Sequence, residues 1–391
     1  MPILGSSASQ SGRAPGDPTN VSAVAGDAQA TVSFTVPAYA GKGAVTYTAT
    51  SSPGGFTASG SSSPLVVTGL SNGTAYTFTV RASASGVQGA ASSASGSVTP
   101  QLPAYALSQT FNASGTYTVP AGKTQIAVVA IGAGGGGGGS PSGNHANVRD
   151  PENKIEGSFS GGGGGGGPVA YFTDYAVNSG QTFSVTVGSG GSAGNGGAGL
   201  GNANIASGTS NPGNSGNAGG QTSFGNLVTL NAGNGGVGGT RNGGGQQGNG
   251  GTVASNNTTL AVTQNGPSAG YGSFCYQNIC SEYPATPGSS NTATINITGI
   301  GAANQQVGGG GGGGNPGYTA FGGNGNAGGA GGAGGGGAGG NNGGPSSTGN
   351  AGSPANARGG GGGGGGGSGG RPNPGTAGGN GAAGQVLVYV R

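Results

Sequence analysis

Residues 124–139 read TQIAVVAIGAGGGGGG, an apolar run that turns into glycine. Thr124–Ile131 has the length and the β-branched composition of a buried β-strand. It enters the glycine run 134–139 without any polar residues between them. This direct junction favours a glycine run that belongs to the fold over a flexible Gly-rich linker, which composition alone would suggest.

The composition of the chain supports the same interpretation. Its 391 residues are enough for two or three domains, and 105 of them are glycine. Only 4% of the residues are charged, so the chain lacks the high net charge of a disordered protein. Because glycine loses more conformational freedom on folding than any other residue, an ordered glycine run needs a contact that side chains would prevent. Packing of backbone directly on backbone is such a contact.

Pure glycine runs occur at 134–139, 161–167, 308–314 and 359–367. Collagen is excluded, since its triple helix needs glycine strictly at every third position and abundant proline. A polyproline II helix advances about 3.1 Å per residue, so the run 359–367 would span roughly 28 Å. Rods without side chains can pack through N–H···O and Cα–H···O contacts. We therefore predict a packed array of polyproline II-like glycine rods, with disordered linkers as the alternative.

Predicted strands separate these runs, which makes residues 109–391 one glycine-rich β domain. Apart from Thr124–Ile131, the predicted strands are Val169–Val177, Thr182–Val187, Thr222–Leu230, Thr252–Val262, Thr292–Thr298 and Gln385–Val390. They alternate with turn residues and contain β-branched and aromatic side chains, as strands do. The predicted fold class is therefore all-β.

The N-terminal part has a different pattern. Ala30–Val36, Ala44–Thr50 and Thr74–Ala82 alternate between apolar and polar residues with a period of two, which predicts short strands in residues 17–100. Several such strands in a stretch of this length indicate a two-sheet sandwich. Residues 1–16, which are small and polar, are predicted to be an N-terminal arm, and residues 101–108, which contain Pro103, a linker.

Residues 69–82, GLSNGTAYTFTVRA, give the most specific signal. A leucine, a short turn and then Gly-Thr-x-Tyr-x-Phe-x-Val-x-Ala resemble the tyrosine corner of fibronectin type III domains. The resemblance covers residues 17–99 and implies that Leu70 and Tyr76 anchor the corner while Phe78 and Val80 face the core. Phe34 stands where a tryptophan is common in that family, and no Arg-Gly-Asp motif is present.

The C-terminal part resembles the glycine-rich domain of bacteriophage tail and fibre proteins. The similar elements are FNASGTYTVPAG at 111–122, GQTFSVTVGSGGSAG at 180–194, GGQTSFG at 219–225 and GGNGAAGQVLVYVR at 378–391. The resemblance implies a virion surface protein, expected to be a tail fibre or tail tip protein that contacts the host. Its expected partners are other virion proteins, a host cell-surface protein or glycan, and further copies of itself, with a trimer as the expected oligomer.

Two other assignments remain open. A capsid decoration or head-fibre protein could be built from the same modules, and so could a bacterial surface adhesin. The first residues, MPILGSSASQ, lack the charged and long apolar regions of a secretory signal, which counts against the adhesin.

The sequence argues against an enzyme. A net charge of +3 without a Lys/Arg cluster excludes a nucleic-acid surface, and no apolar stretch is long enough to span a membrane. Matches to GxGxxG arise by chance in a chain so rich in glycine. Gly122-Lys123-Thr124 resembles the end of a P-loop, but the position of its first glycine is Tyr117. The chain contains one histidine, so neither a catalytic triad nor a metal site is expected, and no cofactor is implied.

The first candidate recognition loop is charged. It holds His145, Arg149, Asp150, Glu152, Lys154 and Glu156 in residues 144–156, between two glycine runs. One interpretation is a solvated loop that gives solubility. The other is a specific contact surface for the host or a neighbouring subunit.

The second candidate recognition loop is aromatic and lies in residues 271–283. It contains Tyr271, Phe274, Tyr276 and Tyr283, in a chain that is only 6% aromatic. Exposed tyrosines suit saccharide or protein recognition because they give a large contact area at low entropic cost; a small buried core under the loop is the alternative. Cys275 and Cys280 lie in the same loop, as a possible disulfide or as two thiols.

Overall fold

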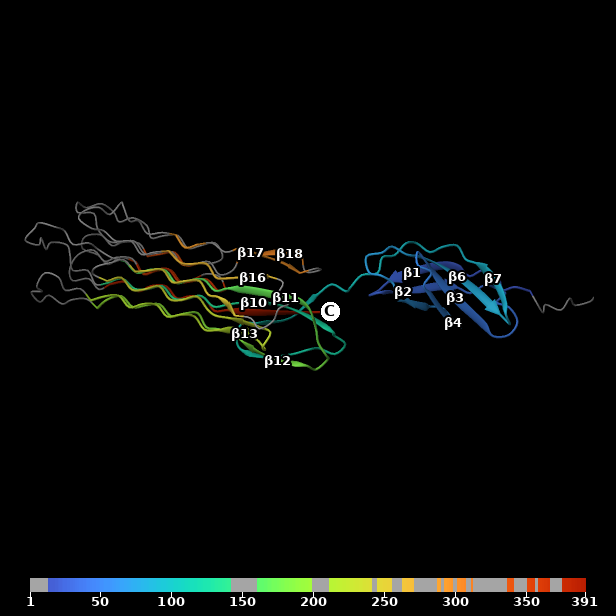
Figure 1. Ribbon diagram of the computed structural model, residues 1–391, viewed down its shortest axis with the longest axis horizontal. Coiled ribbons are helices and arrows are strands. Elements are labelled where there is room, and N and C mark those ends of the chain that lie inside the picture. Colours follow the sequence, from blue (N-terminus) through green and yellow to red (C-terminus); the bar gives the residue numbers. More distant parts are fainter. Residues whose placement is uncertain are drawn as a thin grey trace, which may run out of the picture. The chain divides into compact units, whose positions relative to one another are not determined.

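The protein is described by a computed structural model that divides into two compact units, Met1–Ala104 and Tyr105–Arg391 (Figure 1). The structure describes residues 13–141, 160–198, 211–240, 245–254, 262–270, 287–289, 292–297, 301–306, 311, 336–340, 350–355, 358–365 and 375–391. In these residues the regular elements are strands and no helix occurs, so none could span a membrane. The predicted all-β fold class is confirmed.

The N-terminal unit contains two antiparallel sheets. Its strands are β1 (Thr19–Ala25), β2 (Gln29–Thr35), β3 (Val45–Ser52), β4 (Thr57–Gly60), β5 (Leu65–Thr68), β6 (Thr77–Ala84) and β7 (Val87–Ala91). The sheet orders are β1-β2-β5 and β4-β3-β6-β7. Alternate residues of β2 and β6 are buried, as the period of two predicted. The unit is a fibronectin type III-like sandwich.

The tyrosine corner is formed within this sandwich. The backbone N–H of Ser71 donates to the Tyr76 hydroxyl at 3.0 Å, and the Tyr76 side chain is buried. The N–H of Leu70 donates to the carbonyl of Ala28 at 3.0 Å. Leu70, Phe78 and Val80 are all buried in the same core. The corner thus ties the turn before β6 to the turn between β1 and β2.

The C-terminal unit begins with a second sandwich. Its strands are β8 (Ala106–Phe111), β9 (Gly115–Thr118), β10 (Gln125–Ile131), β11 (Val169–Ala176), β12 (Thr182–Thr186), β13 (Thr222–Phe224), β14 (Val228–Leu230), β15 (Val253–Ala254), β16 (Val262–Gln264), β17 (Thr292–Ile297), β18 (Gly301–Gln306) and β19 (Gln385–Val390). Two five-stranded sheets have the orders β16-β11-β10-β19-β8 and β15-β14-β13-β12-β9, and β17 pairs with β18.

Three predictions of local structure in this unit need correction. Residues 222–230 are two strands, because Gly225, with φ of 52°, turns the chain between them. Ala106–Ser108, assigned to the linker, belong to β8, in which Ala106 and Leu107 pair with β19. The predicted strand Thr252–Val262 is divided between β15 and β16, which belong to different sheets.

An aromatic core lies between the two five-stranded sheets. The rings of Phe183 and Phe224 stack with centroids 4.9 Å apart, and Phe172 and Tyr117 pack around Phe224. The central strand β10 pairs with β11 on one side and with β19 on the other. The strand that enters the first glycine run is therefore fixed on both edges.

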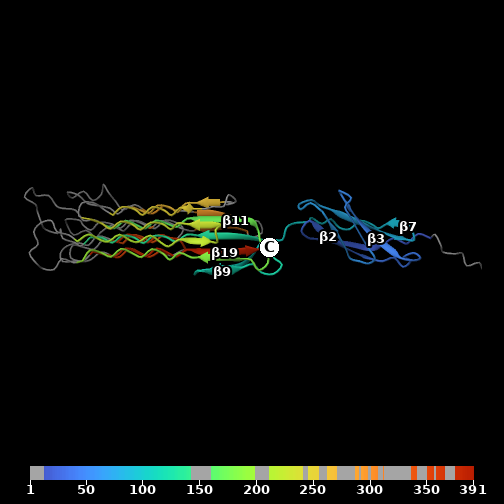
Figure 2. The same cartoon turned by 60° about the horizontal axis from the view of Figure 1, so that its bottom comes forward.

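From the sheets, glycine-rich segments run side by side as extended chains (Figures 1 and 2). We call them the glycine segments; their described residues are 132–141, 160–168, 187–198, 211–221, 231–240, 245–252, 265–270, 336–340, 350–355, 358–365 and 375–384. They hydrogen-bond through the backbone to one another, with partners that recur at every third residue. In the first, Gly134, Gly137 and Ser140 donate to Ala382, Gly379 and Thr376.

The first glycine segment has neighbours on every side. Its N–H groups donate to three antiparallel segments, at residues 376–382, 162–165 and 214–217. Its carbonyl groups accept from three parallel segments, at residues 191–197, 233–239 and 362–365. No space remains for a side chain: a Cβ on Gly137 would lie 2.0 Å from the Gly363 carbonyl oxygen.

The position of a segment matches its glycine pattern. Residues 134–139, 161–167 and 359–365, which are unbroken glycine, are buried throughout. In 187–198 only every third residue is buried, and each of these residues, Gly188, Gly191, Gly194 and Gly197, is a glycine. The exposed positions carry Ser189, Ser192, Asn195 and Ala198. Unbroken runs therefore mark the interior of the bundle, and a period of three marks its surface.

We predict that Gly137→Ala destabilises the bundle by about 1–3 kcal/mol, the usual cost of overpacking, because its methyl group meets backbone on all sides. Asn249→Ala, at an exposed position, is the matched control and should change stability by less than about 0.5 kcal/mol. Thermal unfolding and amide exchange of Gly134–Gly139 measure both. Equal stability of the two variants, with unchanged exchange, would contradict the packing.

Candidate functional site

The two predicted recognition loops lie outside the described residues. This holds for His145, Arg149, Asp150, Glu152, Lys154 and Glu156, for Tyr271, Phe274, Tyr276 and Tyr283, and for the possible disulfide of Cys275 and Cys280. The structure does describe the residues that flank these stretches, and the flanks define how each stretch is attached to the bundle.

The charged stretch joins two adjacent antiparallel segments. Residues 132–141 lead away from β10, and residues 160–168 lead back into β11. Gly135 donates to Gly165 at 2.9 Å and Gly138 donates to Gly162 at 2.8 Å. The residues on both sides of the charged stretch are therefore fixed to each other at the end of the segments away from the sheets.

The flank of the aromatic stretch lies on the same interior segment. Residues 265–270 follow β16 and precede Tyr271. Gly163 donates to Gly270 at 3.1 Å, and Gly166 donates to Pro267 at 2.9 Å. The structure thus brings together the attachment points of two stretches that lie more than a hundred residues apart in sequence. No sequence signal linked them, because the contacts are made by backbone atoms alone.

Buried hydroxyl groups end the interior glycine runs. Ser140 N–H donates to the Thr376 carbonyl at 2.9 Å, and Thr376 N–H donates to Ser140 Oγ at 2.8 Å. The two hydroxyl oxygens are 3.2 Å apart. Ser140 and Ser160 are fully buried. This pair fixes the register of two segments, and no acid or base adjoins it in the described contacts that could make a nucleophile of either hydroxyl.

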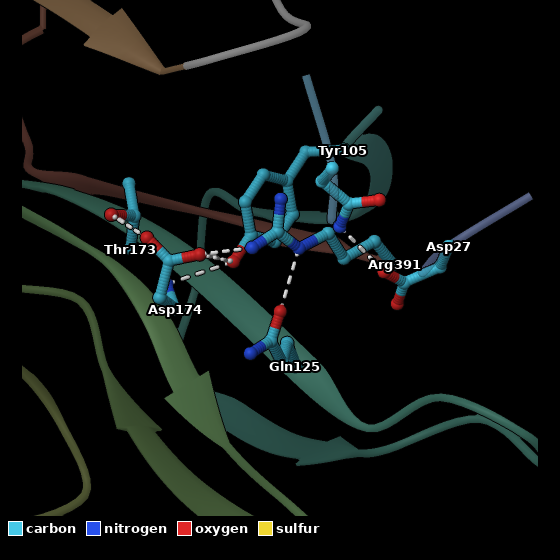
Figure 3. Close-up of polar contacts among 7 residues, drawn as sticks. Asp27, Tyr105, Gln125, Thr173, Asp174 and Arg391 are labelled. Carbon is cyan, nitrogen blue, oxygen red and sulfur yellow. Dashed lines mark hydrogen bonds and ion pairs between the residues drawn. The ribbon is translucent and has the colours of Figure 1, made fainter. Parts of the chain in front are cut away.

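A polar cluster lies at the sheet end of the unit (Figure 3). Arg391 Nε donates to Gln125 Oε1 at 2.7 Å, and an Arg391 terminal nitrogen pairs with Asp174 Oδ1. The guanidinium carbon lies 4.4 Å from the centroid of the Tyr105 ring. The Tyr105 hydroxyl accepts from the backbone N–H of Asp174 at 2.8 Å. The Arg391 side chain is 6% exposed and that of Asp174 is 55% exposed.

The chemistry of this cluster indicates a structural role. Burial raises the pKa of Tyr105, an effect that the hydrogen bond from Asp174 N–H and the charge of Arg391 partly oppose. Tyr105 and Arg391 are the first and last residues of the C-terminal unit, so the cluster joins the two ends of that unit. Sequence reasoning missed it because strand register alone brings the residues together, through Gln125 opposite Ala176 and Ile126 opposite Val390.

Within the described ranges, no group of three His, Cys, Asp or Glu side chains lies close enough to hold a metal ion. The described residues of the glycine segments contain a single charged side chain, Arg358. Any recognition along these segments would therefore depend on amides, hydroxyls and backbone groups.

Comparison with known proteins does not identify a family for this chain. No family model matches the chain, and no curated protein matches it. Among solved structures, the crystal structure of the chicken CNTN1 FN1–FN3 domains is similar at 16% identity and a TM-score of 0.21. The match covers 43% of this chain and 64% of that one, less than two thirds of its length. Our assignment of the N-terminal sandwich rests on its strand order and tyrosine corner.

We predict that Arg391→Met lowers the stability of the C-terminal unit by about 1–3 kcal/mol, because it removes charged hydrogen bonds to Gln125 and Asp174. Lys42→Met, at an exposed position of the other unit, is the control and should have little effect. Urea unfolding followed by amide exchange assigns the loss to a unit. A variant as stable as the unsubstituted chain would show that the cluster contributes nothing.

The buried tyrosines predict a loss of stability at alkaline pH. Burial raises the pKa of Tyr105, Tyr117 and Tyr389. Above the ordinary tyrosine pKa of about 10, the unfolded chain loses these protons more readily than the folded one, so stability is full below that pH and falls above it. Tyr105→Phe should weaken this dependence in chemical unfolding measured from neutral pH to about pH 11. An identical dependence in the variant would exclude a contribution from Tyr105.

Proposed function

We propose that this chain is a bacteriophage virion structural protein, a tail fibre or tail tip component that contacts the host through loops mounted on its glycine bundle. The observation that carries the proposal is the attachment of two candidate recognition stretches to one interior segment, through Gly135, Gly138 and Gly163. A surface protein that must present loops far from its sheets needs a stiff support, and this backbone-bonded bundle provides one.

The glycine segments are, in this proposal, polyproline II-like helices. A polyproline II helix has three residues per turn, and both the hydrogen-bond partners and the burial of residues 187–198 repeat every three residues. At about 3.1 Å per residue, residues 132–141 would extend roughly 30 Å beyond β10. Neighbours on several sides oppose bending, so the far ends of the segments stay at a fixed distance from the sheets.

The distribution of side chains supports recognition at the loops. The described residues of the bundle carry almost no charge, whereas the charged stretch contains Arg149, Asp150, Glu152, Lys154 and Glu156. The aromatic stretch adds Tyr271, Phe274, Tyr276 and Tyr283. Tyrosine and arginine are among the side chains that contribute most to binding at interfaces. We propose a host cell-surface protein or glycan as the partner.

The N-terminal sandwich has the role of a spacer that joins the bundle to other virion proteins. Its exposed surface shows no motif for a specific ligand, and no Arg-Gly-Asp sequence occurs in it. We further propose that the protein acts as a homo-oligomer, as fibre proteins do, because closed symmetry is the rule for such assemblies.

Two experiments test the function: locating the protein on virions, and using purified protein to compete with virions for adsorption to the host. An antibody to the chain should label intact virions at the tail, and purified protein should inhibit host adsorption. Label on the head would favour a decoration or head-fibre protein, and label on uninfected bacteria would favour an adhesin. A protein absent from virions would contradict the proposal.

The recognition part has its own test. Replacing Tyr271, Tyr276 and Tyr283 together by alanine should reduce competition for adsorption by at least about tenfold, as the loss of contact hot spots would. Asn249→Ala, on the exposed side of a glycine segment, is the control and should compete fully. Undiminished competition by the triple variant would exclude the aromatic stretch as the contact.

A further inference from the structure

Strand β8 forms one edge of the five-stranded sheet β16-β11-β10-β19-β8. Its single strand partner in the described part of the chain is β19. Ala106–Thr110 are exposed, and Phe111 points into the core. The outer side of β8 therefore presents unpaired backbone donors and acceptors, which can bind a further strand.

This edge lacks most of the features that normally protect a sheet edge. Residues 106–118, ALSQTFNASGTYT, contain no charged residue and no proline. Leu107 is 55% exposed although it is apolar. β8 does contain one irregularity, a bulge between Leu107, which pairs with Tyr389, and Gln109, which pairs with Val388. Natural edges are usually blocked by charge, proline, bulges, covering elements or very short strands, and of these the described residues of β8 show the bulge.

Several other edges in the described residues are shorter than β8, although β17 and β18, which pair with each other, also have six residues each. In the facing sheet, β15 has two residues and β9 has four. In the N-terminal sandwich β4 and β5 have four residues each, and β1 contains an irregularity between Thr19 and Ser22. Among these edges, β8 combines six residues with exposure of all but the last.

The neighbouring edge strand β9 lies on the same side of the sandwich. The Tyr117 hydroxyl donates to Ser108 Oγ at 3.1 Å, and the rings of Phe111 and Tyr117 are 6.4 Å apart. Thr116 and Thr118 of β9 are exposed. Both sheets therefore end at one side, and their uncharged edges form a continuous surface there.

We propose that this surface binds a second copy of the chain, with β8 pairing antiparallel to β8 of its partner. Antiparallel pairing about a two-fold axis brings the strand next to its own copy, which would be unfavourable for a strand that carries several charges of one sign. With no charge between residues 106 and 118, that penalty is absent. Pairing would join two five-stranded sheets into one of ten strands and would cover Leu107. The inference rests on the homo-oligomer of the proposed function and replaces the expected trimer with a dimer at this edge.

Self-association of the full chain tests the pairing. Light scattering after size exclusion, from about 1 μM to about 100 μM protein, should show a dimer. Leu107→Lys puts a charge on the edge that the partner strand would cover, so the dimer dissociation constant should rise at least about tenfold. Val24→Lys makes the same change at a valine that is 70% exposed in the N-terminal unit, and it should leave the dimer unchanged.

A cross-link gives a second test of the geometry. Gln109→Cys, placed near the middle of β8, should form an intermolecular disulfide under mild oxidation, and peptide mapping should assign it to position 109 rather than to Cys275 or Cys280. Amide exchange of Gly134–Gly139 should be unchanged in both β8 variants, which shows that they are folded. A monomer throughout the concentration range, or a dimer or trimer insensitive to Leu107→Lys, would overturn the proposal. Absence of the protein from virions would overturn its virion role but leave a measured dimer intact.

Discussion

The hydrogen bond from one glycine segment's backbone to the next is the interaction on which the C-terminal unit depends. It requires segments so close that a Cβ on Gly164 would lie 2.2 Å from the carbonyl oxygen of Gly135. Any side chain at such a position would force the segments apart and leave buried N–H and C=O groups without partners, at a cost comparable to a lost hydrogen bond each. The bundle can therefore form only because its interior positions are glycine.

Fixing glycine residues in one conformation costs more conformational entropy than fixing other residues. The bundle itself contains little apolar surface to offset that cost. The apolar core lies instead in the adjoining sandwich, around Phe172, Phe183 and Phe224. Because β10 and β11 continue directly into the segments 132–141 and 160–168, the sheet register also sets the register of these glycines. The packed core thus fixes where the segments start, and many weak backbone contacts maintain their alignment further out.

Sequence reasoning predicted the elements whose signal is local. The predicted strands Thr124–Ile131 and Thr74–Ala82 correspond to β10 (Gln125–Ile131) and β6 (Thr77–Ala84), and the tyrosine corner around Tyr76 is present. Contacts set by tertiary register could not be predicted. The period of three in 187–198 is visible in the sequence, but without neighbours it does not distinguish a surface segment from a linker. Arg391 and Asp174 meet only because β19 and β11 both pair with β10.

The same reliance on backbone separates the fold of this unit from its recognition chemistry. The hydrogen bonds that align residues 134–140 with 162–165 use no side chain, and their partners all lie within the described segments. The stretch between 141 and 160 can therefore change its side chains without removing any of these bonds. Interior positions such as Gly137 tolerate no side chain, because a Cβ there would lie 2.0 Å from the Gly363 carbonyl oxygen. Under the proposed function, a scaffold built this way would allow the contact residues to change without loss of the hydrogen bonds that align the bundle.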